Sequence, residues 1–356
     1  MPDSVDAGPA PLRVGVLTSV SVTLDAFFPE LISVWEQRGW IVKPASGTPA
    51  SAVDSRVLKG VTRTIQWVNV IGAPAIARWV ADERLDVVIT NTAVASALVR
   101  LSGAPVPIVY FCHGLHWSGR GPSVWRMVEA VLARRTTSTI VVNREDERWM
   151  RRRLPESRVL RLDYGVGVPI ERFPRTAAPE VSTPLKLAWM GELTRRKRPE
   201  LALEVAAALR RRGVDLRLVM AGTGPQSARV RRRAAALGLE SVVELPGQVD
   251  VPRLLAESHG VLHTAAWEGL PRVLLEAAAV GRNAYAFDVK GVRDAPSVAL
   301  VPDGDVDALA ALIESQLAAG FPPQPYPAPS ALDSRIRADV IADFVEKTYS
   351  LPRETR

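Results

Sequence analysis

The sequence predicts an α/β protein with two doubly wound domains, and three observations support this. Short runs of β-branched and apolar residues alternate with helical patterns, which is typical of parallel sheets with crossover helices. The alternation occurs in two series of similar length, separated by a polar linker at about 168–184. A chain of 356 residues is also long for a single hydrophobic core, which favours two domains.

The first series contains short Val-, Ile- and Leu-rich runs that predict strands at 13–18, 41–44, 86–90, 107–111, 138–142 and 159–162. Helical periodicity fills the intervals at 24–38, 64–83, 123–133 and 145–153. Gly39 is expected to end the first helix, because glycine readily adopts the left-handed conformation that follows a helix. The helix at 64–83 is interrupted near 72–74, where Gly and Pro disfavour helix.

The second series repeats this pattern. Its strands are expected at 185–190, 216–221, 242–245, 260–264, 283–287 and 298–301, and its helices at 199–212, 226–237, 273–280 and 305–318. Pro199 suits the first turn of a helix, and Gly281 ends the helix at 273–280. A Pro-rich extended segment at 322–329 precedes a last helix at 333–349. The sequence therefore predicts domains at 1–170 and 171–330, followed by a C-terminal helical segment at 331–356.

Composition narrows the function classes. Hydrophobic residues make up 47% of the chain and charged residues 23%, as in globular proteins. No apolar run approaches the ~20 residues that span a bilayer, and the N-terminus has no secretory signal, so a cytoplasmic location is expected. The single cysteine excludes an intrachain disulfide, and the four histidines form no zinc-like cluster, so no bound metal is expected. The net charge of +7 favours acidic partners such as nucleotide phosphates.

Glu268 and Glu276 lie in the most informative stretch of the chain. An apolar strand precedes Glu268, a Gly-Leu-Pro turn follows it, and Glu276 lies early in the next helix. Ligands of open α/β sheets bind beyond the carboxyl ends of the strands, where helix N-termini also point, so both carboxylates would face one ligand. Carboxylates accept hydrogen bonds from sugar hydroxyls, and a helix N-terminus suits a phosphate. The alternative is that Glu276 only complements the helix dipole and Glu268 is a surface turn residue.

Other loops of the second series follow strands at the same edge. Four consecutive cations, Arg195 to Arg198, precede a helix N-terminus, which is unfavourable unless a diphosphate neutralises them. Gly222 to Pro225 forms a glycine turn, a weak signal by itself. In the first series, Thr18 and Ser19 follow the first strand, and His113 and His116 lie in a loop after the strand at 107–111. For the two histidines, ligand-binding and structural roles are both open.

Together these motifs resemble the family 4 retaining glycosyltransferases of the GT-B fold, of the bacterial exopolysaccharide, capsule or natural-product type. The matching features, in chain order, are His113-Gly114-Leu115-His116, Gly165 to Val168 with Arg172-Phe173, Gly191 to Lys197, Gly222 to Pro225, Leu245-Pro246-Gly247, and Glu268 with Glu276 as the family's Glu-x7-Glu pair. The resemblance implies two Rossmann-like domains facing across a cleft. The first would bind the acceptor, the second would bind the nucleotide sugar, and the C-terminal helix would pack back on the first.

The resemblance also assigns roles to residues. It implies that Glu276 holds the donor ribose, Glu268 contacts the transferred sugar and Lys197 binds the diphosphate. His113 would reach the reacting centre, so His113, Glu268 and Lys197 are the expected catalytic residues. Further donor contacts are expected from Gly191, Arg196, Gly222, Gln248, Val249, Gly269, Leu270, Arg272 and Val273. The acceptor side is expected to include Gly15, Thr18, Ser19 and His116.

One position departs from the family pattern. Many members carry an arginine directly after the glycine that corresponds to Gly191, and this arginine binds the diphosphate together with the lysine. This chain has Glu192 there. Either Arg196 or Arg195 would then supply the missing charge.

The implied reaction moves a hexosyl or N-acetylhexosaminyl group from a nucleotide diphosphate sugar, a UDP-sugar first among them, to an acceptor hydroxyl with retained configuration. The nucleotide sugar is then a co-substrate, and no cofactor or metal is implied. Sugar, lipid-linked and small-molecule acceptors all fit. The alternatives are a GT-B nucleotide-sugar epimerase, which needs no second substrate, and a polyanion-binding protein. Because the Arg runs are dispersed along the chain, nucleic acid is not an expected partner.

One helix of the first series raises a second hypothesis. Trp117, Trp125, Arg126, Arg134 and Arg135 flank the helix at 123–133. If the acceptor is lipid-linked, an apolar and basic face there would give peripheral contact with the inner face of the membrane. The alternative is a helix whose apolar side faces the core and whose ends are solvated.

Overall fold

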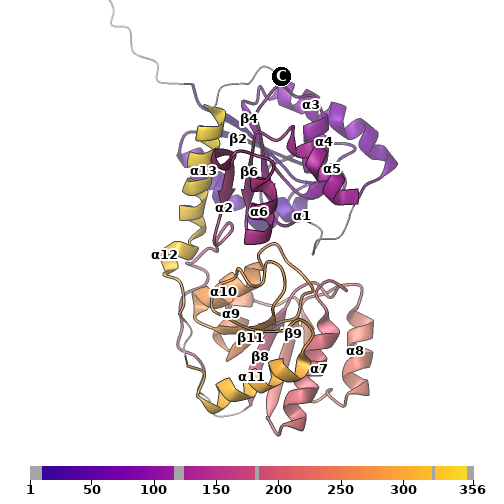
Figure 1. Ribbon diagram of the computed structural model, residues 1–356, viewed down its shortest axis with the longest axis vertical. Coiled ribbons are helices and arrows are strands. Elements are labelled where there is room, and N and C mark those ends of the chain that lie inside the picture. The colour runs from indigo at the N-terminus through magenta and orange to yellow at the C-terminus, as the bar shows by residue number, and fades with distance from the viewer. Residues whose placement is uncertain (1–9, 116–123, 181–183, 323–324, 351–356) are drawn as a thin grey trace, which may run out of the picture. The chain divides into compact units, whose positions relative to one another are not determined.

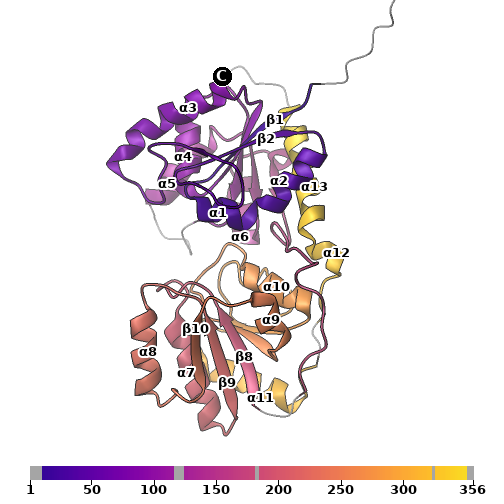
Figure 2. The ribbon, with the colours of Figure 1, turned by 180° about the vertical axis from the view of Figure 1, so that it is seen from behind.

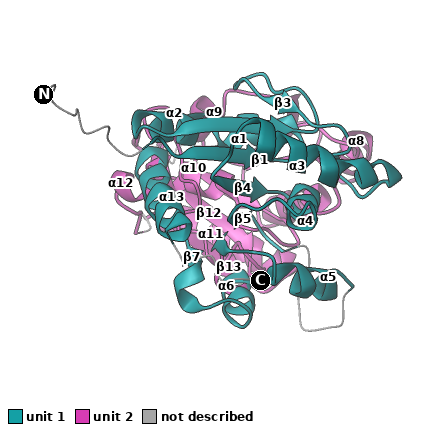
Figure 3. Ribbon diagram, turned by 90° about the horizontal axis from the view of Figure 1, so that it is seen from above, with its two compact units in different colours: residues 1–142, 146–162, 334–356 teal, residues 143–145, 163–333 magenta. Residues whose placement is uncertain are grey.

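The computed structural model describes residues 10–115, 124–180, 184–322 and 325–350 (Figure 1). They form two compact units, which Figure 3 shows in different colours. Unit 1 consists of residues 1–142, 146–162 and 334–356, and unit 2 of residues 143–145 and 163–333. Each unit has its own parallel sheet, so the predicted α/β class is confirmed. The units divide at 162 and 333, whereas the sequence placed the divisions at 170 and 330.

Unit 1 is built on a parallel sheet with the strand order β3-β2-β1-β4-β5-β6-β7. Its strands are β1 (Arg13–Leu17), β2 (Ile41–Ser46), β3 (Arg56–Val57), β4 (Val87–Asn91), β5 (Ile108–Cys112), β6 (Ser138–Val141) and β7 (Val159–Arg161). Every residue of β4 and β5 is buried. Both strands lie between two helical layers, which is why they are almost continuously apolar in the sequence.

The helices of unit 1 lie on both faces of this sheet. They are α1 (Ser21–Phe27), α2 (Pro29–Gln37), α3 (Gly72–Asp82), α4 (Ala93–Leu101), α5 (Val124–Ala133), α6 (Arg144–Arg151) and α13 (Ser334–Tyr349), with 3-10 turns η1 (Trp67–Ile71) and η2 (Glu156–Arg158). Figures 1 and 2 show α3, α4 and α5 side by side on one face and α2 with α13 on the other. The C-terminal helix α13 is attached to α2, because Trp35 Nε1 donates to the carbonyl of Ala338 at 2.9 Å.

Unit 2 has a parallel sheet with the order β10-β9-β8-β11-β12-β13. Its strands are β8 (Leu185–Met190), β9 (Leu216–Ala221), β10 (Val243–Gly247), β11 (Gly260–His263), β12 (Asn283–Phe287) and β13 (Val298–Val301). Its helices are α7 (Pro199–Arg211), α8 (Ser227–Ala236), α9 (Val251–Ala256), α10 (Arg272–Val280), α11 (Val306–Ala318) and α12 (Pro329–Leu332). Helices α7, α8 and α11 cover one face, and α9 and α10 cover the other (Figures 1 and 2).

The order of the strands places the candidate loops at one edge. Strand β8 lies inside the sheet. Strands β9 and β10 follow it outward on one side, and β11, β12 and β13 follow outward on the other. Because all these strands are parallel, the loops that follow β8, β9, β10, β11 and β12 emerge at the same carboxyl edge of the sheet. This edge is the position that the sequence predicted for the ligand.

The structure differs from the predicted elements in a few places. The single helix expected at 24–38 is two helices, α1 and α2, which are separated at Phe28. Pro29 is the first residue of α2, because proline has no N–H to donate and its ring clashes with the preceding helical turn. The expected helix at 64–83 begins at Trp67 as a 3-10 turn. Helices α4, α9 and α12 and the two-residue strand β3 were not predicted.

Candidate functional site

The backbones of the loops after β8 and β9 are in direct contact. Gly191 N–H donates to Ala221 at 3.0 Å, and Gly222 N–H donates to Gly247 at 2.7 Å. Gly222 has φ of 136°, and a Cβ there would lie 2.0 Å from the carbonyl oxygen of Gly191. Only glycine fits at this position. Gly191 and Gly222, two of the predicted donor-binding residues, therefore contribute backbone packing at the carboxyl edge of the sheet.

Two cations converge on the carboxylate of Glu268. Lys197 Nζ lies 2.6 Å from Oε1, and Arg196 Nη1 lies 2.6 Å from Oε2. The guanidinium of Arg196 also lies over the ring of Trp267, with 5.2 Å to the ring centroid. Arg195 and Glu192 are exposed. Of the two arginines that the sequence left open, the structure places Arg196 at the carboxylate.

These charges control the ionisation of the buried Glu268. Burial alone would raise the pKa of this carboxyl, but the cations, Lys197 foremost, outweigh burial and hold the pKa below its ordinary value. Glu268 is therefore ionised at neutral pH. A buried carboxylate with two hydrogen-bonded cations is costly to separate from both partners unless other groups replace them.

His263, at the end of β11, is a member of the cluster that sequence reasoning missed. Burial lowers its pKa to about 3, so the imidazole is neutral at physiological pH. Its Nε2 lies 3.7 Å from Glu268 Oε1 and has no hydrogen-bond partner among the described residues. The only signal in the sequence was a polar residue inside an apolar strand, which more often indicates a structural histidine.

The cationic loop is held against the loop after β11 by Arg198 and Thr264. Arg198, in the left-handed conformation with φ of 48°, donates to the carbonyls of Thr264 at 2.7 Å and Ala265 at 2.8 Å. The hydroxyl of Thr264 lies 3.0 Å from the carbonyl oxygen of Lys197 and accepts a 3.0 Å hydrogen bond from Trp189 Nε1. These contacts hold the backbone at Lys197 and Arg196 in a position from which both side chains reach Glu268. Arg198 thus has a structural role, although the sequence alone does not distinguish it from the other three cations of the run 195–198.

The loop after β12 packs against the turn that contains Glu268. Glu268 N–H donates to the carbonyl of Lys290 at 2.9 Å. Gly291 has φ of 77°, and a Cβ there would lie 2.3 Å from the carbonyl oxygen of Glu268 and 2.4 Å from that of Gly269. Sequence reasoning did not single out Lys290 or Gly291, although a Lys-Gly pair after a strand is a turn signal.

Glu276 lies in the second turn of α10 in a different environment. Its carboxylate pairs with Arg272, four residues earlier, at 3.1 Å between Nε and Oε1. Burial raises the pKa of Glu276, and Arg272 only partly opposes this. The two carboxylates of the Glu-x7-Glu pair therefore differ, because the pKa is lowered at Glu268 and raised at Glu276. Of the other predicted donor residues, Gly269 is buried, Leu270, Val273 and Val249 are half-buried and Gln248 is exposed.

The predicted residues of unit 1 are placed less uniformly. The half-buried His113 packs against the rings of Phe111 and Phe27 at centroid distances of 4.4 and 5.1 Å. Burial lowers its pKa to about 4, and its Nε2 is buried with no hydrogen-bond partner among the described residues. The prediction for His116 concerns a residue outside the described ranges.

Three residues expected on the acceptor side are engaged within unit 1. Gly15 lies in the middle of β1, where a Cβ would lie 2.6 Å from both Trp79 and Leu85, so packing within unit 1 explains this glycine. The buried hydroxyl of Ser19 accepts from the N–H of Ala95 at 3.1 Å. The buried Thr18 hydroxyl donates to the carbonyl of Val20 at 3.0 Å.

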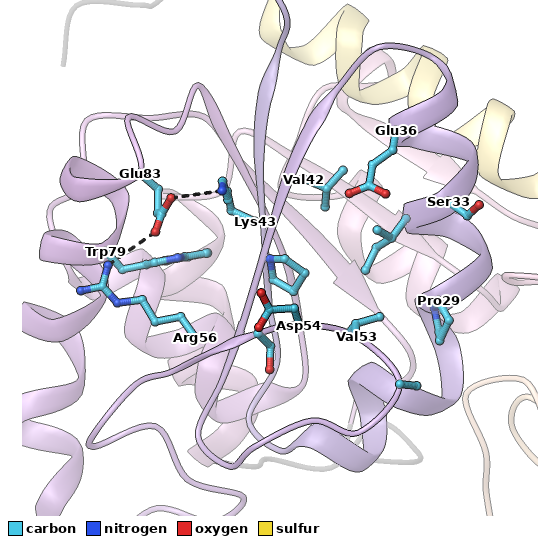
Figure 4. Close-up of a pocket in the computed structure, with 14 residues that line it drawn as sticks. Pro29, Ser33, Glu36, Val42, Lys43, Val53, Asp54, Arg56, Trp79 and Glu83 are labelled. Carbon is cyan, nitrogen blue, oxygen red and sulfur yellow. Dashed lines mark ion pairs between the residues drawn. The ribbon is translucent and has the colours of Figure 1, made fainter.

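A cavity of about 560 Å³ lies in unit 1 beside the middle of β2, lined by residues of α2, β2, β3 and α3 (Figure 4). Its two cations share one carboxylate. Lys43 Nζ lies 3.7 Å from Glu83, and Arg56 lies 3.7 Å from the same carboxylate. The cavity is not at the carboxyl ends of the strands. Its two cations lie 3.7 Å from Glu83, whereas Lys197 and Arg196 lie within hydrogen-bond distance of Glu268, so the cluster around Glu268 is the stronger candidate site.

Within the described ranges, no group of His, Cys, Asp and Glu has the arrangement of a metal site. None of the helices in those ranges is both long and apolar enough to cross a bilayer.

Comparison with known proteins agrees with this geometry. Residues 173–324 match the family model described as "Glycosyl transferases group 1", and residues 41–166 match "Glycosyltransferase Family 4". EpsD of Bacillus subtilis (strain 168), whose name describes it as a glycosyltransferase, is 26% identical over 325 residues, which are 83% of this chain and 85% of EpsD. WcaL of Escherichia coli (strain K12), named as a colanic acid biosynthesis glycosyltransferase, is 31% identical over 158 residues, 41% of this chain and 39% of WcaL.

The fold also matches solved structures. The crystal structure of Anabaena HepE superposes with a TM-score of 0.73 at 16% identity and covers 94% of this chain and 100% of HepE. At this identity the likeness concerns the fold. Together, the two family models and the two parallel sheets confirm the resemblance seen in the motifs. The chain therefore belongs to the glycosyltransferases of the GT-B fold, with a family 4 domain in its first half and a group 1 domain in its second.

Proposed function

We propose that the chain transfers a hexosyl or N-acetylhexosaminyl group from a UDP-sugar to an acceptor hydroxyl, with retention of configuration and without a metal. The observation that carries this proposal is the convergence of Lys197 and Arg196 on Glu268 at the carboxyl edge of unit 2. HepE, which shares the fold, has been crystallised with UDP and with UDP-glucose, which supports a uridine donor. A cytoplasmic location is part of the proposal and agrees with the one free, buried cysteine, Cys112.

The cluster can exchange partners when the donor binds. Without donor, Glu268 holds the charges of Lys197 and Arg196 in place beside the start of α10. The diphosphate then attracts both cations, and the N-terminus of α10 adds the positive end of its dipole. Glu268 becomes available to accept hydrogen bonds from sugar hydroxyls. His263 Nε2 lies 3.7 Å from this carboxylate, so a small shift would bring the two within hydrogen-bond distance after the cations have turned to the phosphates.

The proposed reaction is a substitution on one face of the sugar, and this placement supports it. The bond between the anomeric carbon and the leaving phosphate oxygen breaks while the acceptor oxygen bonds to the same face of the sugar. The departing phosphate oxygen takes the acceptor's proton, so no enzyme carboxylate has to act as nucleophile. Lys197, Arg196 and the α10 dipole stabilise the charge that develops on the diphosphate. Glu276, deeper in α10, holds the ribose hydroxyls.

A panel of nucleotide sugars in a thermal-shift assay tests donor binding. A ligand at a hundred times its dissociation constant adds about 2.7 kcal/mol to the free energy of unfolding, which raises the melting temperature measurably. We expect a UDP-sugar to give the largest shift, unchanged by EDTA. Nuclear magnetic resonance of the product should show the donor's anomeric configuration. An inverted product would contradict the mechanism, and turnover of donor without acceptor would point to the epimerase instead.

Arg196 is expected to replace the arginine that other family members carry at the position of Glu192. Arg196→Ala removes a charged hydrogen bond to the donor diphosphate, worth about 1.5–3 kcal/mol or roughly ten- to a hundredfold in kcat/KM. Arg195→Ala is the matched control, because this neighbouring arginine is exposed. Steady-state kinetics with both variants decides between them. Equal losses, or a larger loss for Arg195→Ala, would contradict the assignment.

A further inference from the structure

Helix α5 exposes apolar side chains to solvent. Val124, Met127 and Val131 are 64%, 72% and 64% exposed, and Trp125 and Val128 are also exposed. The spacing of Val124, Met127, Val128 and Val131 places them on one face of the helix. In a surface helix this face ordinarily packs on the core. The structure therefore leaves this apolar face in solvent, although Leu132 and Ala133 on the other side of α5 are buried.

The buried side of α5 explains this orientation. Glu129 is buried and forms a two-pronged ion pair with Arg100 of α4, with 3.1 Å between Nη2 and Oε2. Arg100 also lies over the ring of Tyr110, with 4.5 Å to the centroid. Turning the apolar face of α5 inward would leave these buried charges without partners, which is strongly destabilising. The exposed apolar face is thus maintained by the packing beneath it.

The charged residues on α5 and directly after it are, apart from Glu129, all cations. Arg134 and Arg135 directly follow the helix and are exposed, and Arg126 lies on it. Between Asp86 and Glu145 the sequence contains one acidic residue, Glu129, whose charge is neutralised by Arg100. The surface of α5 therefore combines apolar side chains with cations and no exposed carboxylate.

A second exposed apolar group belongs to the same helical layer. Trp67 and Val70 of η1 are 86% and 80% exposed, and Ile71 is exposed as well. η1 leads directly into α3, which contacts α4, and α4 contacts α5. Figures 1 and 2 show α3, α4 and α5 next to each other on one face of the unit 1 sheet. Tryptophan side chains are favoured at the boundary between lipid and water.

We propose that the exposed face of α5, made of Val124, Trp125, Met127, Val128 and Val131 with Arg134 and Arg135, docks unit 1 on an anionic lipid bilayer. Apolar side chains would enter the acyl boundary while the arginines contact anionic headgroups, as in interfacial amphipathic helices. A second copy of the chain fits less well, because this face carries arginines and no exposed carboxylate, so pairing it with itself offers the arginines no opposite charge. Membrane docking goes beyond the proposed sugar transfer, which does not depend on it.

Co-sedimentation of the full chain with vesicles tests this proposal. We expect binding to vesicles of phosphatidylglycerol and phosphatidylcholine, weakening with salt, and little binding to phosphatidylcholine alone. The variant Trp125→Gln/Met127→Gln should bind roughly tenfold or more weakly. Arg134→Gln/Arg135→Gln should lower the affinity by a similar factor and flatten the salt dependence. The control is Val22→Gln, which changes a residue of α1 that is 74% exposed and should bind as the wild type does.

Folding and self-association are measured on the same samples. Melting temperature and donor-induced thermal shift should match the wild type in all three variants, because the substituted side chains are exposed and lie outside the donor cluster. The proposal is overturned if anionic vesicles sediment no more protein than neutral ones, or if both α5 variants bind like Val22→Gln. It is also overturned if the wild type forms dimers that the α5 variants lose, with no vesicle binding.

Discussion

Lys197→Ala is expected to lower kcat/KM for the donor by about 10²–10³-fold, or ~2.7–4 kcal/mol, the cost of removing one preorganised donor that stabilises developing charge. Lys197 is largely buried and lies 2.6 Å from Glu268, so its ammonium is already placed before a donor arrives. Without it, the leaving diphosphate loses a cation and Glu268 keeps only Arg196 and the neutral His263 nearby. The loss should appear in kcat as well as in the donor KM.

Lys186→Ala provides the matched control for this variant. Lys186 also pairs with a carboxylate, Glu257, at 2.8 Å, but it lies near the amino end of β8, at the opposite edge of the sheet. Its loss should leave activity within about twofold, because exposed pairs contribute ~0–1 kcal/mol. Comparable activity in Lys197→Ala and the wild type would refute the diphosphate role. A collapse of both variants, with lowered melting temperatures, would indicate a folding effect.

Glu276→Ala is expected to raise the donor dissociation constant by roughly a hundredfold, because two hydrogen bonds from ribose hydroxyls to a charged acceptor are lost, at about 1.5–3 kcal/mol each before compensation by water. Glu276→Gln should lose somewhat less, since its amide oxygen still accepts. Isothermal titration with UDP measures both. Glu257→Gln, which changes the partly exposed carboxylate paired with Lys186, is the control and should bind UDP normally. Normal UDP binding by Glu276→Ala would refute the ribose assignment.

The raised pKa of Glu276 adds a pH dependence whose sign is defined. Because burial raises this pKa in the folded chain, the ionised form is the one that folding disfavours. Stability is therefore lost as pH rises from the ordinary carboxyl pKa through the raised one, and Glu276→Gln should be as stable as the wild type or more stable at neutral pH. Donor affinity should change oppositely and fall as acid protonates Glu276. The glutamine variant should lack this acid-side loss, and its persistence would point to another group.

A helix or strand could be predicted from the sequence when the residues that determine it lie within the element itself. The strands at 185–190 and 283–287 were predicted with the observed bounds, because a buried parallel strand is a short apolar run wherever it occurs. Helix α4 was missed because its sequence, AVASALVRL, is apolar almost throughout and shows no polar face. The break between α1 and α2 was signalled by Pro29, but the helical periodicity continues across it and masked the signal.

The position of the candidate site could be predicted from the sequence, but the contacts between its side chains could not. That loops after parallel strands gather at one edge follows from topology, so Glu268, Glu276, Lys197 and Gly222 could be grouped from the sequence. The sequence could not decide between Arg195 and Arg196, because neighbouring residues in a loop share the same composition and the same spacing. The structure shows that Arg196 contacts Glu268, 72 positions away in the chain, whereas Arg195 is exposed.

The sequence by itself determined the two-domain α/β class, the glycosyltransferase family and the sheet edge where the candidate site residues lie. Hydrophobic periodicity, turn glycines, short motifs and the succession of strands and helices along the chain are all local features of the sequence. Only the tertiary structure decided which cations Glu268 holds, that its pKa falls while that of Glu276 rises, and that α5 faces outward. Each of these depends on the burial of charged groups and on the distances between them, as between Arg100 and Glu129. Neither quantity exists until the chain has folded.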